Sequence, residues 1–127
     1  FLKFALLVGV LAFIMSLVAA LFYDNPRPFV VTGIVPLVEH APDNGFPSDH
    51  ALFTGTIAAT VMVVNPFIGA LLWIIATLVS VGRVLAGVHH TIDIIASFAI
   101  AIASAIAVKY LYPLRKTREV VSLDRQA

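Results

Sequence analysis

The sequence predicts an all-α fold, a polytopic bundle of transmembrane helices. Of its 127 residues, 61% are hydrophobic and 12% are charged, with a mean hydropathy of +1.02, whereas a soluble domain has about 25% charged residues. The apolar residues also form long runs, and about 20 apolar residues are needed to cross roughly 30 Å of hydrocarbon. The absence of cysteine excludes disulfides and thiolate metal sites, and a net charge of +1 gives no sign of a nucleic-acid partner.

Four transmembrane spans are expected, at about residues 4–22, 49–64, 67–85 and 91–111. The first apolar run is longer than the roughly 7–15 residues of a signal-peptide core, so we expect a spanning helix there. The second run is short, but its helix can begin at a Ser48 cap. Asn65-Pro66 marks a tight turn that makes the second and third spans antiparallel neighbours. Pro113 follows the last span closely.

Basic residues indicate the direction of these spans. Six of the eight lysines and arginines fall on the side of the termini: Lys3, Lys109, Arg115, Lys116, Arg118 and Arg125. Arg27 and Arg83 fall on the other side. The positive-inside rule therefore places both termini in the cytoplasm and the loop of residues 23–47 on the outer face. We expect a transmembrane domain over residues 1–112 and a cytoplasmic polar tail over residues 113–127.

Polar groups interrupt the apolar chain in three places, all at the expected outer face. Ionisable residues at membrane depth cost roughly 2.5–3.5 kcal/mol on insertion scales, which makes them functional candidates. The candidates are, in chain order, Arg27, Ser48, His50, Arg83, His89, His90 and Asp93. Taken singly, each has an ordinary role, because serine commonly caps helices and arginine anchors helix ends to head groups. Glu39 and His40 are expected to be ordinary loop residues.

In combination, these residues suit phosphoryl transfer. Ser48 at a helix start places its hydroxyl beside free backbone N–H groups, a natural anion site, and two arginines can hold phosphate oxygens in bidentate fashion. His89 and Asp93 are four residues apart and would share one helix face. There the carboxylate can hold one imidazole nitrogen and leave the other free to attack. His50, on a different helix, is free to act as an acid.

The spacing of these residues resembles a known family, the type 2 phosphatidic acid phosphatase superfamily. Its signature is Lys-x6-Arg-Pro, Pro-Ser-Gly-His and Ser-Arg-x5-His-x3-Asp. The corresponding stretches here are Arg27-Pro28, Pro47-Ser48-Asp49-His50, and Arg83 with His89 and Asp93. The forms "FPSDHA" and "GVHHTID" resemble the bacterial undecaprenyl-diphosphate phosphatase branch. Three positions depart from the signature, where lysine, serine and glycine are replaced by Ala20, Gly82 and Asp49.

The resemblance implies a role for each residue. His89 would attack phosphorus and form a phosphohistidine, Asp93 would orient it, and His50 would protonate the leaving group. The phosphate would be bound by Arg27, Ser48 and Arg83. No metal or other cofactor is expected. His90 matches no motif position, although it lies three residues from Asp93. Family members usually have six spans with the signature on the last four, which correspond to the four spans expected here.

The implied function is that of an integral enzyme of the bacterial cytoplasmic membrane. It would hydrolyse a polyprenyl (undecaprenyl) diphosphate to the monophosphate on the periplasmic or extracellular face, which recycles the cell-wall lipid carrier. The alternatives are a phosphatidylglycerophosphate or phosphatidate phosphatase, and a non-catalytic phospholipid-binding or transport module. A metal-dependent hydrolase would use His50, His89, His90 and Asp93, and an intramembrane serine protease would use Ser48. The sequence carries no expectation about oligomeric state.

Overall fold

The computed structural model describes residues 1–112 and 114, and these fold as helices and loops. The helices are α1 (Leu2–Phe22), α2 (Pro28–Thr32), α3 (Asp49–Val64), α4 (Pro66–Leu85) and α5 (Thr91–Leu111). The described residues contain no β-strand, although Pro26 and Asn44 form an isolated antiparallel bridge. The all-α class is therefore confirmed, as are the four long helices, whereas α2 was not expected. The predicted cytoplasmic tail, residues 113–127, lies outside the described residues apart from Leu114.

Polar caps explain where three of the long helices begin. At α3, the Ser48 hydroxyl accepts from the backbone N–H three residues on, at 3.4 Å. At α4, the Asn65 side chain accepts in the same way at 3.1 Å, and Pro66 occupies the first helical position, where a missing N–H has no consequence. At α5, the His90 backbone N–H donates to the Asp93 carboxylate at 2.8 Å. Each cap satisfies groups that a helix end otherwise leaves unpaired.

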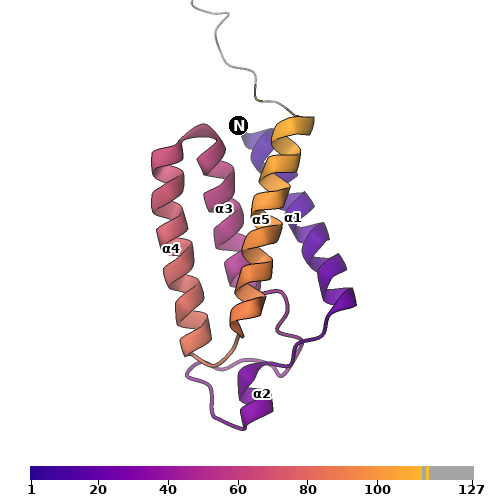
Figure 1. Ribbon diagram of the computed structural model, residues 1–127, viewed down its shortest axis with the longest axis vertical. Helices are drawn as coiled ribbons and strands as arrows, with labels where there is room; N and C mark the ends of the chain where they lie inside the picture. The colour runs from indigo at the N-terminus through magenta and orange to yellow at the C-terminus, as the bar shows by residue number, and fades with distance from the viewer. Residues whose placement is uncertain (113, 115–127) are drawn as a thin grey trace, which may run out of the picture.

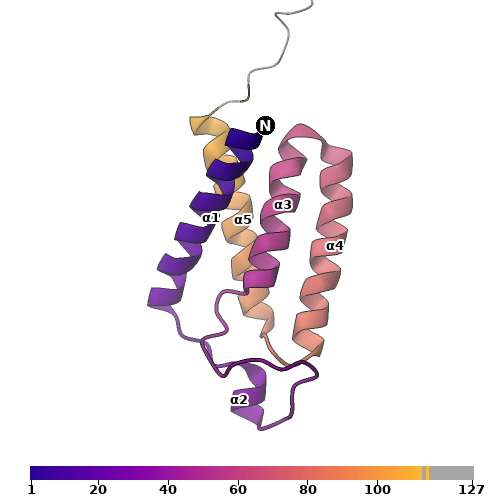
Figure 2. The same cartoon turned by 180° about the vertical axis from the view of Figure 1, so that it is seen from behind.

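The four long helices run alternately up and down to form an antiparallel bundle (Figure 1). α3 packs against α4 and α5, and α1 packs against α5 and α3, as the view from behind also shows (Figure 2). The buried apolar residues form two clusters: Phe4, Val8, Ala59, Ala105 and Val108, and Ala12, Leu52 and Ile100. Most of the other buried residues of the long helices are alanine, serine or glycine. Small side chains let helix backbones approach closely, which is the usual packing of helices in membranes.

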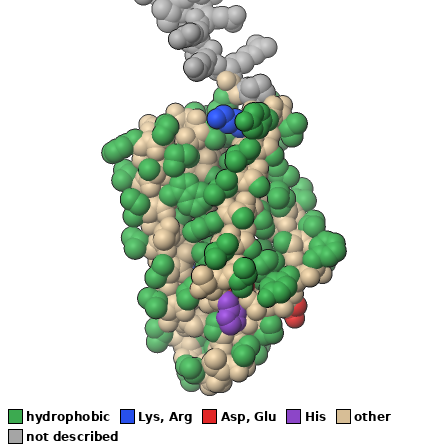
Figure 3. Space-filling view, in the orientation of Figure 1, with side chains coloured by type: hydrophobic (Ala, Val, Ile, Leu, Met, Phe, Trp, Pro, Cys, Tyr) green, Lys and Arg blue, Asp and Glu red, His purple; other side chains and the backbone are tan. Residues whose placement is uncertain are grey.

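The outside of the bundle is apolar. Figure 3 shows hydrophobic side chains over most of one face, with a basic group toward one end and histidine and acidic groups toward the other. Within the described residues, α1, α4 and α5 are long and apolar enough to cross a membrane. α3 has 16 residues, which span about 24 Å and fall short of roughly 30 Å of hydrocarbon. Three candidate spans are thus present, and the four-span count stays a prediction.

Two connections that carry polar residues meet at one end of the bundle. The loop between α1 and α3, which includes α2, lies beside the short link between α4 and α5 in both views (Figures 1 and 2). Backbone hydrogen bonds join the two connections, from Phe29 N–H to the Gly87 carbonyl at 3.2 Å and from Leu37 N–H to the Ala86 carbonyl at 3.0 Å. Gly87 has a φ of 79°, a left-handed conformation that glycine adopts without steric cost. This end of the bundle carries the predicted site residues.

Candidate active site

Three segments that are far apart in the sequence converge at this end of the bundle. The Gly45 N–H donates to the Asn25 carbonyl at 3.0 Å, and the Ser48 N–H donates to the Asp93 carbonyl at 3.3 Å. The Ser97 hydroxyl lies 2.9 Å from the Ser48 carbonyl and 2.8 Å from the Asp93 carbonyl. The loop after α1, the start of α3 and the start of α5 are therefore held against one another by buried polar groups.

His89 lies in the link between α4 and α5, and its side chain is enclosed, with 2% of the residue exposed. Its Nδ1 lies 3.0 Å from the Gly45 carbonyl oxygen and 3.4 Å from the Asp93 carboxylate. Its Nε2 lies 3.2 Å from Nη1 of Arg27. A carbonyl can only accept and a guanidinium can only donate, so Nδ1 carries the proton and Nε2 keeps its lone pair.

The electrostatic environment keeps His89 neutral. Burial lowers the pKa of His89 below its ordinary value, and the positive charge of Arg27 lowers this pKa further. Asp93 and the Gly45 carbonyl raise the pKa of His89, but by less than burial and Arg27 lower it. A neutral imidazole with an available Nε2 lone pair is the form that can attack an electrophile. The site therefore presents a candidate nucleophile that needs no deprotonation at neutral pH.

Arg27 is the most connected cation of the site. It is 4% exposed, and prolines on both sides restrict its backbone. Its Nε donates to Asp43 at 2.7 Å, and its Nη1 donates to the Val88 carbonyl at 2.9 Å as well as approaching His89. The hydrogen bond from Arg27 lowers the pKa of Asp43, although this side chain is 61% exposed. Arg27 thus presents a fixed positive charge beside Nε2 of His89.

Arg83 and Ser48 approach the site from α4 and from the start of α3. Arg83 lies in the last turn of α4, and its Nε is buried without a hydrogen-bond partner among the described residues. A buried guanidinium N–H without an acceptor is unfavourable, and an anionic oxygen is the acceptor that arginine binds best. Ser48 is fully buried and caps α3. Among the described residues no imidazole hydrogen-bonds to this hydroxyl, as a serine nucleophile would require, so the geometry gives no support to a serine protease.

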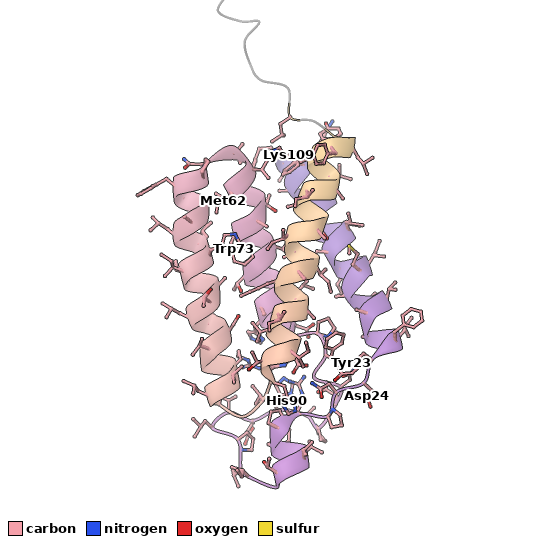
Figure 4. The ribbon with its side chains drawn as sticks, viewed as in Figure 1. Tyr23, Asp24, Met62, Trp73, His90 and Lys109 are labelled. Carbon is pink, nitrogen blue, oxygen red and sulfur yellow. The ribbon has the colours of Figure 1, made fainter. Side chains whose placement is uncertain are left out.

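Two of the other three histidines, His50 and His90, differ from His89 in their contacts. His50 lies in the first turn of α3 with an exposed side chain, and its ring forms no hydrogen bond with the other described residues. It is therefore free to contact a ligand. The ring of His90, which Figure 4 labels near the loop after α1, donates from Nε2 to the Pro26 carbonyl at 3.0 Å. His90 also caps α5, so the geometry gives it a structural role.

Comparison with known proteins identifies the family of this chain. Residues 1–117 match the model of the PAP2 superfamily. The chain belongs to the PAP2 superfamily. Undecaprenyl-diphosphatase BcrC of Bacillus subtilis is 34% identical over 101 residues, which cover 78% of this chain and 51% of that protein.

Two further relatives of this PAP2 protein carry related names. Bacitracin transport permease protein BcrC of Bacillus licheniformis is 29% identical over 111 residues, covering 87% of this chain and 55% of that protein. Undecaprenyl-diphosphatase of Sulfolobus acidocaldarius is 37% identical over 91 residues, covering 70% of this chain and 44% of that protein. The chain spans about half the length of the curated relatives it matches. The family resemblance of the motifs is thereby confirmed.

The PAP2 signature positions that differ in this chain have distinct surroundings. Ala20, in place of the family lysine, lies near the end of α1 and supplies no cation. Gly82, in place of serine, has open space around it, since an added side-chain carbon would meet nothing within 4 Å. Asp49, in place of glycine, is exposed in the first turn of α3. A carboxylate there is favourable for the helix dipole.

Some residues of this site were not singled out by their sequence pattern. Asn25, Asp43 and Gly45 contact Asp93, Arg27 and His89, respectively. The ring centroid of His40 lies 6.4 Å from that of His89, and His40 Nδ1 lies 3.8 Å from Asp43, so His40 borders the site. Within residues 1–112 and 114, no group of three or more His, Asp or Glu side chains is arranged to hold a metal ion. The metal-site hypothesis therefore has no ligand set among them.

Proposed function

We propose that this PAP2 protein is a lipid phosphatase that hydrolyses a polyprenyl diphosphate to the monophosphate. The observation that carries the proposal is the buried, neutral His89, whose unprotonated Nε2 lies 3.2 Å from the guanidinium of Arg27. The names of two relatives, both undecaprenyl-diphosphatases, support undecaprenyl diphosphate as the substrate. Hydrolysis would regenerate the monophosphate form of the cell-wall lipid carrier.

The proposed reaction has two displacements at the terminal phosphorus. Nε2 of His89 attacks phosphorus, a phosphohistidine forms, and the bond from phosphorus to the bridging oxygen breaks, so that the lipid monophosphate leaves. His50 supplies the proton that the leaving oxygen needs. Water then attacks the phosphohistidine, His50 takes up a proton from that water, and inorganic phosphate departs with His89 restored. Atoms and charges balance without a further reactant.

Three groups support this reaction by binding the transferred phosphoryl group. Arg27 exchanges its contact with His89 for a phosphate oxygen, and the unpartnered Nε of Arg83 binds another. Ser48 would contribute its hydroxyl at the start of α3. Catalysis of phosphoryl transfer resides largely in such stabilisation of the equatorial oxygens. Asp93, 3.4 Å from Nδ1, stabilises the positive charge that the ring acquires during attack.

The proposal also concerns the placement of the protein in the membrane. Residues 1–112 would form the transmembrane phosphatase domain, with α3 completing a four-helix arrangement beside three spanning helices. The lysines of the two chain ends support cytoplasmic termini, and the site would then face the periplasmic or extracellular side. A diphosphate head group would reach the site from the membrane surface while its polyprenyl tail stays in the bilayer.

A substrate panel on the purified full chain tests this function. The wild-type protein should release phosphate from undecaprenyl diphosphate in the presence of EDTA. His89→Ala should lower kcat about a thousandfold or more, as removal of a nucleophile does. His90→Asn alters the residue next to His89 and should retain most activity, because asparagine is a favourable N-cap residue for α5. Rapid acid-free quenching should detect phosphohistidine in the wild type and not in His89→Ala.

The same panel separates the competing functions. Faster turnover of phosphatidylglycerophosphate or phosphatidate than of the diphosphate would assign a phospholipid phosphatase instead. Binding of these lipids without phosphate release would assign a non-catalytic lipid-binding or transport module. Full activity in His89→Ala would remove the phosphohistidine mechanism.

A further inference from the structure

We propose that Asn25 is a positioning residue of this active site, whose side-chain amide fixes the Asp93 carboxylate relative to His89. The inference rests on the proposed function, because positioning has consequences only if His89 reacts. Asn25 occupies one of the six unspecified positions of the Lys-x6-Arg-Pro stretch, in the loop two residues before Arg27. Its role is indicated by its contacts alone.

The contact between Asn25 and Asp93 joins two segments that are distant in the sequence. Nδ2 of Asn25 donates to Oδ1 of Asp93 at 2.8 Å, across a separation of 68 residues. Asp93 is 0% exposed, so this oxygen has lost its contact with water. A donor to a buried carboxylate is worth more than an ordinary hydrogen-bond donor, because an unpaired buried charge is strongly unfavourable. Asn25 therefore supplies, from a neutral side chain, the hydrogen bond that one oxygen of this buried carboxylate needs.

The other carboxylate oxygen is the one that lies near His89. Oδ2 of Asp93 accepts from the His90 backbone N–H at 2.8 Å and lies 3.4 Å from His89 Nδ1. The two oxygens belong to one planar group, so the hydrogen bond from Asn25 to Oδ1 limits rotation of the group. It thereby sets where Oδ2 lies relative to the imidazole ring. Misplacement of a reacting group by 1 Å can lower a rate about 100-fold.

The backbone of Asn25 is linked to the second acceptor of His89. The Asn25 carbonyl accepts from the Gly45 N–H at 3.0 Å, and the Gly45 carbonyl in turn lies 3.0 Å from His89 Nδ1. The Asn25 N–H donates to the Asn44 side-chain oxygen at 2.9 Å. Asn25 thus contacts, through its side chain and its backbone, both groups that neighbour Nδ1 of His89. Apart from His89 itself, no other described loop residue makes both contacts.

Asn25 and Asn44 have opposite hydrogen-bonding roles, which provides a matched test. The Asn25 side chain acts as a donor to a carboxylate. The Asn44 side chain acts as an acceptor for two backbone N–H groups, those of Asn25 and Phe46, both at 2.9 Å. Asn44 also donates to the exposed Tyr23 carbonyl at 3.2 Å. An asparagine-to-aspartate change keeps an acceptor and removes a donor, so the same change should be harmful at one position and tolerated at the other.

The experiment compares Asn25→Asp with Asn44→Asp in the purified full chain, with undecaprenyl diphosphate as substrate. Asn25→Asp places a second carboxylate against that of Asp93. It should lower kcat about tenfold or more, which is the equivalent of one hydrogen bond to a charged group. KM should change little, because Arg27 and Arg83 remain. The rate of phosphohistidine formation in a single turnover should fall with kcat. Asn44→Asp should stay within about twofold of the wild type, since both of its accepted hydrogen bonds persist.

Thermal unfolding in detergent identifies variants that fail to fold. If Asn25→Asp is unfolded, Asn25→Ala replaces it, because it removes the donor without adding charge and should also lower kcat. A folded Asn25 variant with wild-type kcat, or an equal loss in Asn44→Asp, would overturn the positioning role while leaving the phosphatase function intact. A wild-type protein that releases no phosphate would overturn the proposed function and this inference with it.

Discussion

At the scale of single residues, the state of His89 is decided by groups that are remote in the sequence. The Gly45 carbonyl is the nearest acceptor for Nδ1, at 3.0 Å, whereas Asp93 lies at 3.4 Å. Asp93 also caps α5 through the His90 N–H. The expectation that His89 and Asp93 share one helix face is wrong, because His89 precedes α5 (Thr91–Leu111). The two side chains still lie close together, and the carboxylate serves both the ring and the helix start.

The pH dependence of activity should report the neutral state of His89. Because burial and the charge of Arg27 lower the pKa of His89, the ring stays unprotonated below the ordinary histidine value of about 6.5. The acid limb of kcat/KM against pH should then lie below 6.5. Arg27→Gln removes one cause of the lowered pKa, so its acid limb should move to higher pH even though its activity is reduced. An acid limb that lies above 6.5 in the wild type would contradict the assignment.

A methyl group at Gly45 would be in tight contact with three site residues. A side-chain carbon there would lie 3.2 Å from Cγ of Arg27, 3.2 Å from the Asn25 carbonyl oxygen and 3.4 Å from Asp93 Oδ2. Neighbours would have to move by a few tenths of an ångström, and because a 1 Å misplacement can cost about 100-fold, Gly45→Ala should lower kcat severalfold. Gly9→Ala, where an added carbon meets nothing within 4 Å, is the control. Equal kcat in the two variants would show that the loop adapts.

The sequence predicts the ionisable members of the site better than the members that cannot ionise. Arg27 and His89 were identified because ionisable groups are rare and costly in an apolar chain. Asn25 and Gly45 act through an amide and a backbone carbonyl, and such groups occur in any polar loop. His40 was expected to be an ordinary loop residue, yet its ring borders that of His89. The path of the 23–47 loop determines these contacts, and local sequence pattern does not encode that path.

At the scale of elements, the long helices were predictable and the short one was not. The starts expected at residues 49 and 91 agree with those of α3 and α5, and the start expected at residue 67 lies one residue inside α4. Ser48 and Asn65-Pro66 indicated two of these boundaries because caps and prolines act locally. α2 (Pro28–Thr32) has five residues, too few to be stable alone. It is held by tertiary contact, as in the hydrogen bond from Phe29 to Gly87, and it ends at Gly33, which has a φ of 70°.

The hairpin of α3 and α4 depends on glycine at position 69. A side-chain carbon on Gly69 would lie 2.7 Å from the backbone nitrogen of Met62, closer than van der Waals contact allows. Gly69→Ala should therefore separate the two helices and lower stability by about 1–3 kcal/mol, the usual effect of overpacking. The measurement is the melting temperature in detergent, with Gly9→Ala as the control in an open helix position. A Gly69→Ala protein that melts with the wild type would show that the hairpin opens freely.

At the scale of the whole molecule, polar and ionisable side chains lie at the two ends of an apolar bundle, and the candidate site lies at one of these ends. Figure 4 labels Lys109 at one end and Asp24 and His90 at the other. Between them, the bundle surface carries apolar side chains such as Phe13, Leu78 and Ile95. This distribution suits a protein that crosses the bilayer and reacts at one surface. Which surface that is follows only from the distribution of lysine and arginine, because the fold is compatible with either direction.

Accessibility of introduced cysteines should decide the direction, and the chain is suited to this because it has no cysteine. Asp24 and Lys109 are both exposed, at the site end and at the opposite end of the bundle. If the positive-inside rule holds here, Asp24→Cys in intact cells should react with a membrane-impermeant maleimide, and Lys109→Cys should react only after permeabilisation. The wild-type protein is the blank for both. The reverse pattern would place the site on the cytoplasmic side, where a lipid diphosphate would have to be presented from within the cell.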